Sequence, residues 1–120
     1  MTNRLPALRS RIYVHRPSLR DAREFLAAAR RSRALHHPWT SAPATRAAFR
    51  AYAERMALPG NRAFFVRRRD DDALVGVFNI TNIVLGAFRS AYLGYYAFAG
   101  HERQGLMREG LAAVLRQAFR

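Results

Sequence analysis

Cysteine is absent from this chain of 120 residues, and its absence narrows the structures open to it. Without thiols the chain can form no disulfide and no thiolate metal site. The adjacent pair His36-His37 is expected in a loop, because neighbouring side chains diverge. No metal-ligand spacing appears among the four histidines, which are His15, His36, His37 and His101. We therefore expect no metal site.

Long apolar runs are missing too. No stretch approaches the roughly 20 apolar residues that a membrane-spanning helix needs, and the first ten residues lack the apolar core of a signal peptide. With no cysteine and no export signal, a cytoplasmic location without membrane contact is the default expectation. The length is that of one domain with a modest core.

Lysine is also absent, so all 21 basic residues are arginine, against eight acidic residues. The net charge of +13 suggests acidic partners such as ribosomal RNA or a phosphate-bearing cofactor. However, the arginines are scattered, and an arginine- and alanine-rich composition is equally expected from a biased genome. The one cluster, Arg67-Arg68-Arg69, is followed at once by Asp70-Asp71-Asp72. This pattern predicts a solvated turn rather than a nucleic-acid-binding patch.

The first half of the chain is predicted to form one strand and two helices. Residues 11–16 alternate apolar and polar side chains, as a half-buried strand does, and Pro17 ends them. Ser18 and Asp21 resemble a capping box that opens a helix over about residues 19–33. The predicted apolar face of this helix is Leu19, Ala22, Leu26 and Ala29.

The second helix is expected to begin near Pro43, which suits a first turn, and to end at residues 59–61. Its predicted apolar face is Phe49, Tyr52, Ala53 and Met56. Residues 63–68 and 73–80 then read as two strands of a β-hairpin. The second strand continues towards Gly86, which turns the chain into the next strand.

The last thirty residues, 91–120, carry the clearest functional pattern, a strand, a short turn at residues 103–105 and an amphipathic helix. The strand is aromatic, with Tyr92, Leu93, Tyr95, Tyr96 and Phe98, and the helix has an apolar face of Met107, Leu111, Val114, Leu115 and Ala118. A glycine-bearing turn that opens a helix points several backbone N–H groups the same way, at the positive end of the helix dipole. Such a turn can bind phosphate or diphosphate.

This segment resembles the acetyl-coenzyme-A-binding core of the GNAT N-acetyltransferases, whose signature is Q/R-x-x-G-x-G/A. It looks most like the branch that acetylates ribosomal-protein N-termini (RimJ/RimL-like). In that branch the sequence LGY is followed by about eight residues of strand and turn and then by GKGLM-x-EAL. Here Leu93-Gly94-Tyr95 is followed at that spacing by Arg103-Gln104-Gly105-Leu106-Met107-Arg108-Glu109-Gly110-Leu111. The similarity extends upstream through residues 74–77 and 79–84, and to His37-Pro38-Trp39.

The resemblance implies acetyl transfer from acetyl-CoA, with no metal, to a protein N-terminal α-amine. The implied partner is a ribosomal protein, with a possible ribosome contact. Because an α-amine has a pKa of about 7.7–8.0, the demand on a general base is mild and positioning should matter more.

The resemblance also implies the site residues. The N–H groups of residues 103–107 would hold the diphosphate, and exposed amides of residues 95–98 would bind the pantetheine arm. The full cofactor set is Tyr95, Tyr96, Ala97, Phe98, Arg103, Gln104, Gly105, Leu106 and Met107. Trp39 would wall the acceptor pocket or simply anchor its loop. Asn79 and Asn82 would bind the acceptor backbone or cap strand ends. No catalytic base is assigned, and the candidates by location are Glu102, His101 and Tyr95.

Three positions depart from the family pattern. Glu102 stands at the Q/R position and adds negative charge beside the expected diphosphate. Arg103 replaces a turn glycine, although its guanidinium could bind phosphate. Gly110 replaces an alanine and should weaken the helix by about 1 kcal/mol. Glu109, inside the helix, is expected to be structural.

The predicted fold is α+β with three layers, in the order β-α-α-β-β-β-α, and its twisted sheet is mostly antiparallel. Residues 1–120 correspond to the N-terminal two-thirds of one GNAT domain, because the strand expected after the last helix is lacking. That lack would leave an unpaired, apolar edge. We therefore expect the 120 residues alone to bind acetyl-CoA weakly and to turn over little or nothing.

Two other functions stay open from the sequence. The acceptor could be a small-molecule amine, since the acceptor pocket is the least specified part. Alternatively, the chain could be a non-catalytic basic module that docks on ribosomal RNA, although it lacks an aromatic RNP strand or a GXXG loop. RNA binding should collapse with added salt, whereas cofactor binding should depend on the phosphoadenosine and pantetheine parts.

Overall fold

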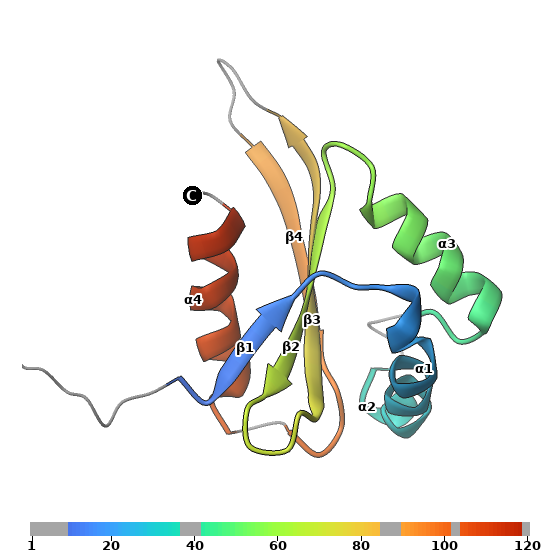
Figure 1. Ribbon diagram of the computed structural model, residues 1–120, viewed down its shortest axis with the longest axis vertical. Coiled ribbons are helices and arrows are strands. Elements are labelled where there is room, and N and C mark those ends of the chain that lie inside the picture. The colour runs from blue at the N-terminus through green and yellow to red at the C-terminus, as the bar shows by residue number, and fades with distance from the viewer. Residues whose placement is uncertain (1–9, 37–41, 85–89, 102–103, 119–120) are drawn as a thin grey trace, which may run out of the picture.

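The structure, a computed structural model, describes residues 10–36, 42–84, 90–101 and 104–118. These residues form three layers, with a four-stranded sheet in the middle, helix α4 on one face and helices α1–α3 on the other (Figure 1). The elements in chain order are β1 (Ile12–His15), η1 (Leu19–Asp21), α1 (Ala22–Arg31), α2 (Arg33–His36), α3 (Arg46–Met56), β2 (Arg62–Arg68), β3 (Leu74–Val84), β4 (Ser90–Ala97) and α4 (Leu106–Ala118). The predicted three-layer α+β fold is confirmed, with the short α2 as an addition.

The strand order in the sheet is β1-β2-β3-β4, and each strand is antiparallel to its neighbours. The predicted β2–β3 hairpin is confirmed, and each of its strands has five consecutive buried residues. β4 is different, because it is the outer strand of this sheet and its first six residues are exposed. The apolar edge expected from the sequence is therefore the edge of β4.

The predicted capping box after β1 is confirmed. The Ser18 hydroxyl accepts a hydrogen bond from the Arg20 N–H (3.3 Å), and the Ser18 N–H donates to the Asp21 carboxylate (2.8 Å). The capped turn is the 3₁₀ helix η1, whose tighter winding takes Leu19 out of the apolar stripe of α1. Leu19 is consequently 50% exposed, and the prediction that it lies on the apolar face of the helix is wrong. The buried residues of α1 are Ala22, Phe25, Leu26 and Ala28.

Helix α3 begins later than its proline suggested. Thr45 is the N-cap, and its hydroxyl accepts a hydrogen bond from the Ala48 N–H (3.0 Å). Pro43 therefore lies before the helix rather than in its first turn, because Thr45 supplies the side-chain cap that a proline cannot. The predicted inward residues Phe49, Tyr52 and Met56 are buried.

The core on the α1–α3 face is aromatic. The ring of Phe25 lies 5.0 Å from that of Phe49, 5.4 Å from that of Phe65 and 5.5 Å from that of Phe98, measured between centroids. Tyr52 stacks on Phe65 at 6.4 Å. Each buried aromatic ring removes a large apolar area from water, so this cluster anchors α1 and α3 to the sheet.

The core on the α4 face is instead built around small residues. A Cβ on Gly110 would lie 3.0 Å from Val66 and 3.2 Å from Phe78. A Cβ on Gly76, in β3, would lie 2.5 Å from the Met107 sulfur and 2.7 Å from the Tyr96 carbonyl oxygen. Gly110 therefore does more than weaken the helix, as the sequence suggested, because it lets α4 approach the sheet closely.

The buried face of α4 differs from the predicted face at one residue. Leu115 is 44% exposed, so its predicted burial is wrong. The buried residues of α4 are Leu106, Gly110, Ala113 and Val114. Among the described residues, no helix is both long and apolar enough to cross a bilayer.

Candidate functional site

Strand β4 presents its outer edge at the point where the chain turns towards α4. The Phe98 N–H donates a hydrogen bond to the Val75 carbonyl of β3 (2.7 Å). Backbone groups along an antiparallel strand alternate in direction, so the N–H of Tyr95 points away from β3. The expectation of exposed amides along residues 95–98 is therefore wrong for Phe98, whose amide bonds inward and whose side chain is buried.

The two adjacent tyrosines of β4 face opposite sides of the sheet. Tyr95 stacks on Phe78 (5.5 Å between centroids) towards α4 and is 64% exposed. Tyr96 packs edge-on against Phe98 (5.7 Å) towards α1. Burial raises the pKa of Tyr96 far above its ordinary value. The Tyr96 hydroxyl therefore stays protonated near neutral pH, and of the two tyrosines only Tyr95 is well placed for contact with a ligand.

The turn between β4 and α4 ends at a glycine in the left-handed region, Gly105, with φ of +75°. The Gly105 carbonyl accepts the first helical hydrogen bond, from the Glu109 N–H (3.2 Å). The N–H groups of Leu106 and Met107 belong to the first turn of α4, where no intrahelical acceptor exists. Among the described residues none accepts from them, while their side chains point inward to buried and part-buried positions. N–H groups in this position, at the positive end of a helix dipole, can donate to an anion.

Arg11 links this turn to β1, the strand at the opposite edge of the sheet from β4. Its Nε donates to Glu109 Oε2 (2.5 Å), its backbone N–H donates to Glu109 Oε1 (3.0 Å), and its Nη2 donates to the Gln104 carbonyl oxygen (2.9 Å). Burial alone would raise the pKa of Glu109, but the hydrogen bonds and charge of Arg11 outweigh it and lower the pKa. Glu109 thus ties α4 to β1, in line with the structural role expected from the sequence.

A polar pocket of about 270 Å³ opens beside the same turn. Its lining residues are Arg11, Arg68, Arg69, Asp70, Gln104 and Leu106. Arg68 is paired with Asp70 and Asp71, whereas Arg69 lies over the Tyr13 ring (5.8 Å). The carboxylates of Glu109, Asp70 and Asp71 offset the charges of Arg11 and Arg68, and Arg69 adds positive charge beside the α4 N-terminus.

The two asparagines of β3 have different environments. Asn79 pairs with Gly94 across the strands, and its Oδ1 accepts a hydrogen bond from the Tyr52 hydroxyl (2.5 Å). Asn82 has φ of +56° at an irregularity in the β3–β4 pairing, and its N–H donates to Asn61 Oδ1 (3.3 Å). Asn79 is thus held on the α3 face near the middle of the sheet, while Asn82 accommodates a local bulge.

Other residues singled out from the sequence are placed less fully. Trp39, Glu102 and Arg103 lie outside the described residues. His101 is partly buried, in the turn after β4. Within the described part of the chain, no group of three or more His, Asp or Glu side chains could hold a metal ion.

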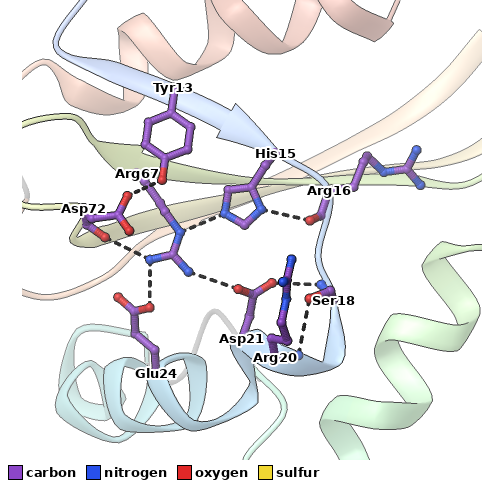
Figure 2. Close-up of polar contacts among 9 residues, drawn as sticks. All are labelled: Tyr13, His15, Arg16, Ser18, Arg20, Asp21, Glu24, Arg67 and Asp72. Atoms are coloured by element: carbon purple, nitrogen blue, oxygen red, sulfur yellow. Dashed lines mark hydrogen bonds and ion pairs between the residues drawn. The ribbon is translucent and has the colours of Figure 1, made fainter.

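A polar cluster centred on Arg67 was not predicted from the sequence, which indicated a solvated turn for Arg67-Arg68-Arg69. Arg67 is only 6% exposed, and Figure 2 shows its guanidinium surrounded by acceptors from three segments. Its Nε donates to His15 Nε2 (2.8 Å), its Nη1 to Glu24 (2.7 Å) and to the Asp72 carbonyl (2.9 Å), and its Nη2 to Asp21 (3.1 Å). The solvated-turn prediction is therefore wrong for Arg67.

This network joins α1, β1 and the β2–β3 turn. Asp72 is held further by the Tyr13 hydroxyl, and the cleft above the network has a volume of about 430 Å³. Burial alone would lower the pKa of Arg67, but its bond to Glu24 and the surrounding carboxylates outweigh it and raise the pKa. The sequence signal was the pair Asp21 and Glu24, three positions apart and hence on one helical face.

Comparison with known proteins identifies the arrangement. A family model described as an acetyltransferase (GNAT) domain matches residues 11–120. The chain belongs to the GNAT acetyltransferase family. The resemblance inferred from the strand, turn and helix of residues 91–120 is thereby confirmed, and the site described above lies in the part of the chain that the GNAT model covers.

Individual relatives agree with this assignment. The chain is 31% identical to a probable N-acetyltransferase, YjcK, of Bacillus subtilis over 68 residues, which are 57% of this chain and 38% of that protein. It is 40% identical to the [ribosomal protein uS5]-alanine N-acetyltransferase of Escherichia coli over 47 residues, 39% of this chain and 24% of that protein.

The fold of this GNAT chain is shared with Mycobacterium smegmatis RimJ in complex with CoA-disulfide, with a TM-score of 0.79 at 19% identity. The match covers 90% of this chain and 56% of the RimJ chain. The chain thus spans little more than half of that structure, and less of the two matched relatives.

Proposed function

We propose that this GNAT chain serves acetyl transfer from acetyl-CoA to the N-terminal α-amine of a protein. The observation that carries the proposal is a combination. The N–H groups at Gly105–Met107 lie at the start of α4, Arg69 lines the adjacent pocket, and β4 is the outermost strand of the described sheet. A diphosphate suits the start of α4, and an extended amide-bearing chain such as pantetheine suits the edge of β4.

The residues fit the coenzyme in three respects. The positive φ of Gly105 brings backbone rather than side chain to the ligand side of the turn. The outward amide of Tyr95 is available to a pantetheine carbonyl, as in strand addition. Arg69, whose guanidinium lies over the Tyr13 ring, adds positive charge beside the turn. Acetyl-CoA would supply the acetyl group as a thioester.

The transfer itself asks little of a general base. The amine nitrogen bonds to the carbonyl carbon, the C–S bond breaks, and the proton that the amine loses balances the thiolate that leaves. Because the α-amine pKa is about 7.7–8.0, roughly a tenth is neutral at pH 7. The main contribution of this chain is therefore positioning, and we assign no catalytic base.

A peptide acceptor is the best-supported substrate class. Asn79, oriented by Tyr52, places an amide group on the α3 side of the sheet opposite Gly94, over which the space within 4 Å is empty. A backbone carbonyl of the acceptor is a suitable partner for this amide. The uS5-alanine acetyltransferase named among the relatives supports a ribosomal-protein N-terminus. A ribosome contact would be consistent with the net charge of +13.

Calorimetric titration of the 120-residue chain with CoA tests the coenzyme site. We expect weak but saturable binding that ADP competes for and that moderate salt does not abolish. Gly105→Ala, which forces a Cβ onto φ of +75° at 3.2 Å from Arg11, should weaken binding about tenfold.

The control for that substitution is Gly60→Ala. Gly60 also has a positive φ, of +91°, but lies at the end of the α3 loop. It should carry a similar backbone strain and leave CoA binding unchanged. No detectable binding by the unsubstituted chain at millimolar CoA would contradict the coenzyme site, and binding of RNA that vanishes with salt would favour the docking module instead.

The acceptor class is tested with a peptide that carries both an N-terminal alanine and an internal lysine. Long incubation with acetyl-CoA at high protein concentration, followed by mass spectrometry, reveals which amine is modified. We expect slow transfer, confined to the α-amine. Preferential acetylation of the lysine, or of an added diamine, would contradict the proposal that the acceptor is an N-terminal α-amine.

A further inference from the structure

We infer that Arg11 is a positioning residue that sets the orientation of the coenzyme-binding turn. Arg11 directly precedes β1, the strand at the opposite edge of the sheet from β4. The inference rests on the proposed function. Arg11 lies 93 residues before Gln104, whose carbonyl oxygen it binds at 2.9 Å. No other described side chain bonds a carbonyl of residues 104–107.

The first step of the argument is the geometry of one peptide unit. The carbonyl of Gln104 and the N–H of Gly105 belong to the same planar, trans peptide, so they point in opposite directions. When the Arg11 guanidinium draws the Gln104 carbonyl towards β1, the Gly105 N–H must point away from β1. Arg11 thereby sets the direction of the first amide of the anion site.

The second step concerns Glu109, one turn into α4. A carboxylate there would repel the phosphates of a coenzyme bound at the same helix end. Arg11 donates to both carboxylate oxygens, through its backbone N–H to Oε1 and its guanidinium to Oε2. The negative charge is thus neutralised and held towards β1.

The third step is why the contact needs arginine. One guanidinium reaches the Glu109 carboxylate through Nε and the Gln104 carbonyl through Nη2, which is possible because its donors are fixed in a planar fork. A lysine ammonium keeps the charge but lacks this fork. Arg11 is 53% exposed in its side chain, so the contact adds little to global stability, and its main effect is on the turn.

The test uses Arg11→Gln, Arg11→Lys and the charge-matched control Arg50→Gln. Arg50 is exposed on α3, on the other face of the sheet. Calorimetry with CoA should show about tenfold weaker binding for Arg11→Gln, an intermediate loss for Arg11→Lys, and a change below about twofold for Arg50→Gln.

A second readout does not require the coenzyme. In amide hydrogen exchange, the Glu109 N–H, which donates to the Gly105 carbonyl at the end of the turn (3.2 Å), should exchange at least about fivefold faster in Arg11→Gln than in Arg50→Gln, while the β2 and β3 amides stay protected. A merely structural role would instead raise exchange across the whole fold. If Arg11→Gln does not fold, the same comparison is made with Arg11→Lys, which keeps the positive charge beside Glu109.

The outcomes separate the two proposals. If the unsubstituted chain binds CoA but both Arg11 variants bind within twofold of Arg50→Gln, the positioning role is wrong and the coenzyme site stands. If the unsubstituted chain does not bind CoA, the coenzyme site fails, and exchange at the Glu109 N–H still decides whether Arg11 orders the turn. Unchanged exchange there overturns the inference.

Discussion

The two faces of the sheet are held in different ways. On the α1–α3 face, large aromatic rings fill the core, and Arg67 is sealed at 6% exposure among Asp21, Glu24 and His15. On the α4 face, small residues let the helix approach the sheet closely, and the linking arginine, Arg11, is half exposed. The first face stabilises the fold, while on the second face the half-exposed Arg11 holds the proposed coenzyme turn.

Removal of Arg67 should give the largest effect. Arg67→Met leaves the part-buried Asp21 without its cation and His15 without its donor, so we expect a loss of about 3 kcal/mol in the free energy of unfolding. Urea denaturation measures the loss, with the exposed Arg50→Met as the control, for which we expect less than about 0.5 kcal/mol. Equal losses for the two variants would contradict the claim that the buried Arg67 stabilises the fold more than an exposed arginine does.

A pair of glycines tests the close packing of α4. Gly76→Ala would place its Cβ 2.5 Å from the Met107 sulfur and 2.7 Å from the Tyr96 carbonyl, so we expect a loss of about 2 kcal/mol. Gly94→Ala, on the adjacent strand, meets nothing within 4 Å and should change stability by less than about 0.5 kcal/mol. Thermal unfolding measures both variants. Similar shifts in melting temperature for the two would mean that α4 moves to accommodate the added methyl group, and would contradict close packing of α4 on the sheet.

The smallest effect is a pH dependence at Glu109. Arg11 lowers the folded-state pKa of Glu109, after outweighing the opposing effect of burial. The stabilisation is therefore present above the ordinary pKa of about 4.3 and is lost as the pH falls through the lower, folded-state value. In Glu109→Gln the fall in stability between about pH 5 and pH 3 should be shallower, by about 0.5 kcal/mol. Identical pH profiles would show that the ion pair contributes nothing.

Local signals in the sequence predicted the fold well. The capping box at Ser18, the β2–β3 hairpin and the strand–turn–helix after residue 90 all depend on neighbours within a few positions, and all are present. Leu19 was misplaced because it lies in a 3₁₀ turn, which a strict 3.6-residue period does not anticipate. Leu115 was misplaced because α4 buries Leu106, Gly110, Ala113 and Val114 and leaves Leu115 exposed.

The candidate site divides in the same way. Gly105 and the first turn of α4 were predicted, because a glycine before an apolar period marks a helix start. Arg11 and Arg67 were not, because their partners lie far along the chain, at Glu109 and Gln104 in the one case and at Asp21 and Glu24 in the other. The nearby Asp70-Asp71-Asp72 suggested local ion pairs for Arg67, but in the structure Asp70 and Asp71 pair with Arg68.

The most direct test of the account is a proton–nitrogen NMR titration of the chain with CoA. The account predicts that the largest amide shifts fall on Gly105, Leu106, Met107 and Tyr95, with little change along β1 and α3. Shifts confined to the Arg67 cleft, or spread over the exposed arginines and removed by salt, would contradict the assignment of the coenzyme to the start of α4.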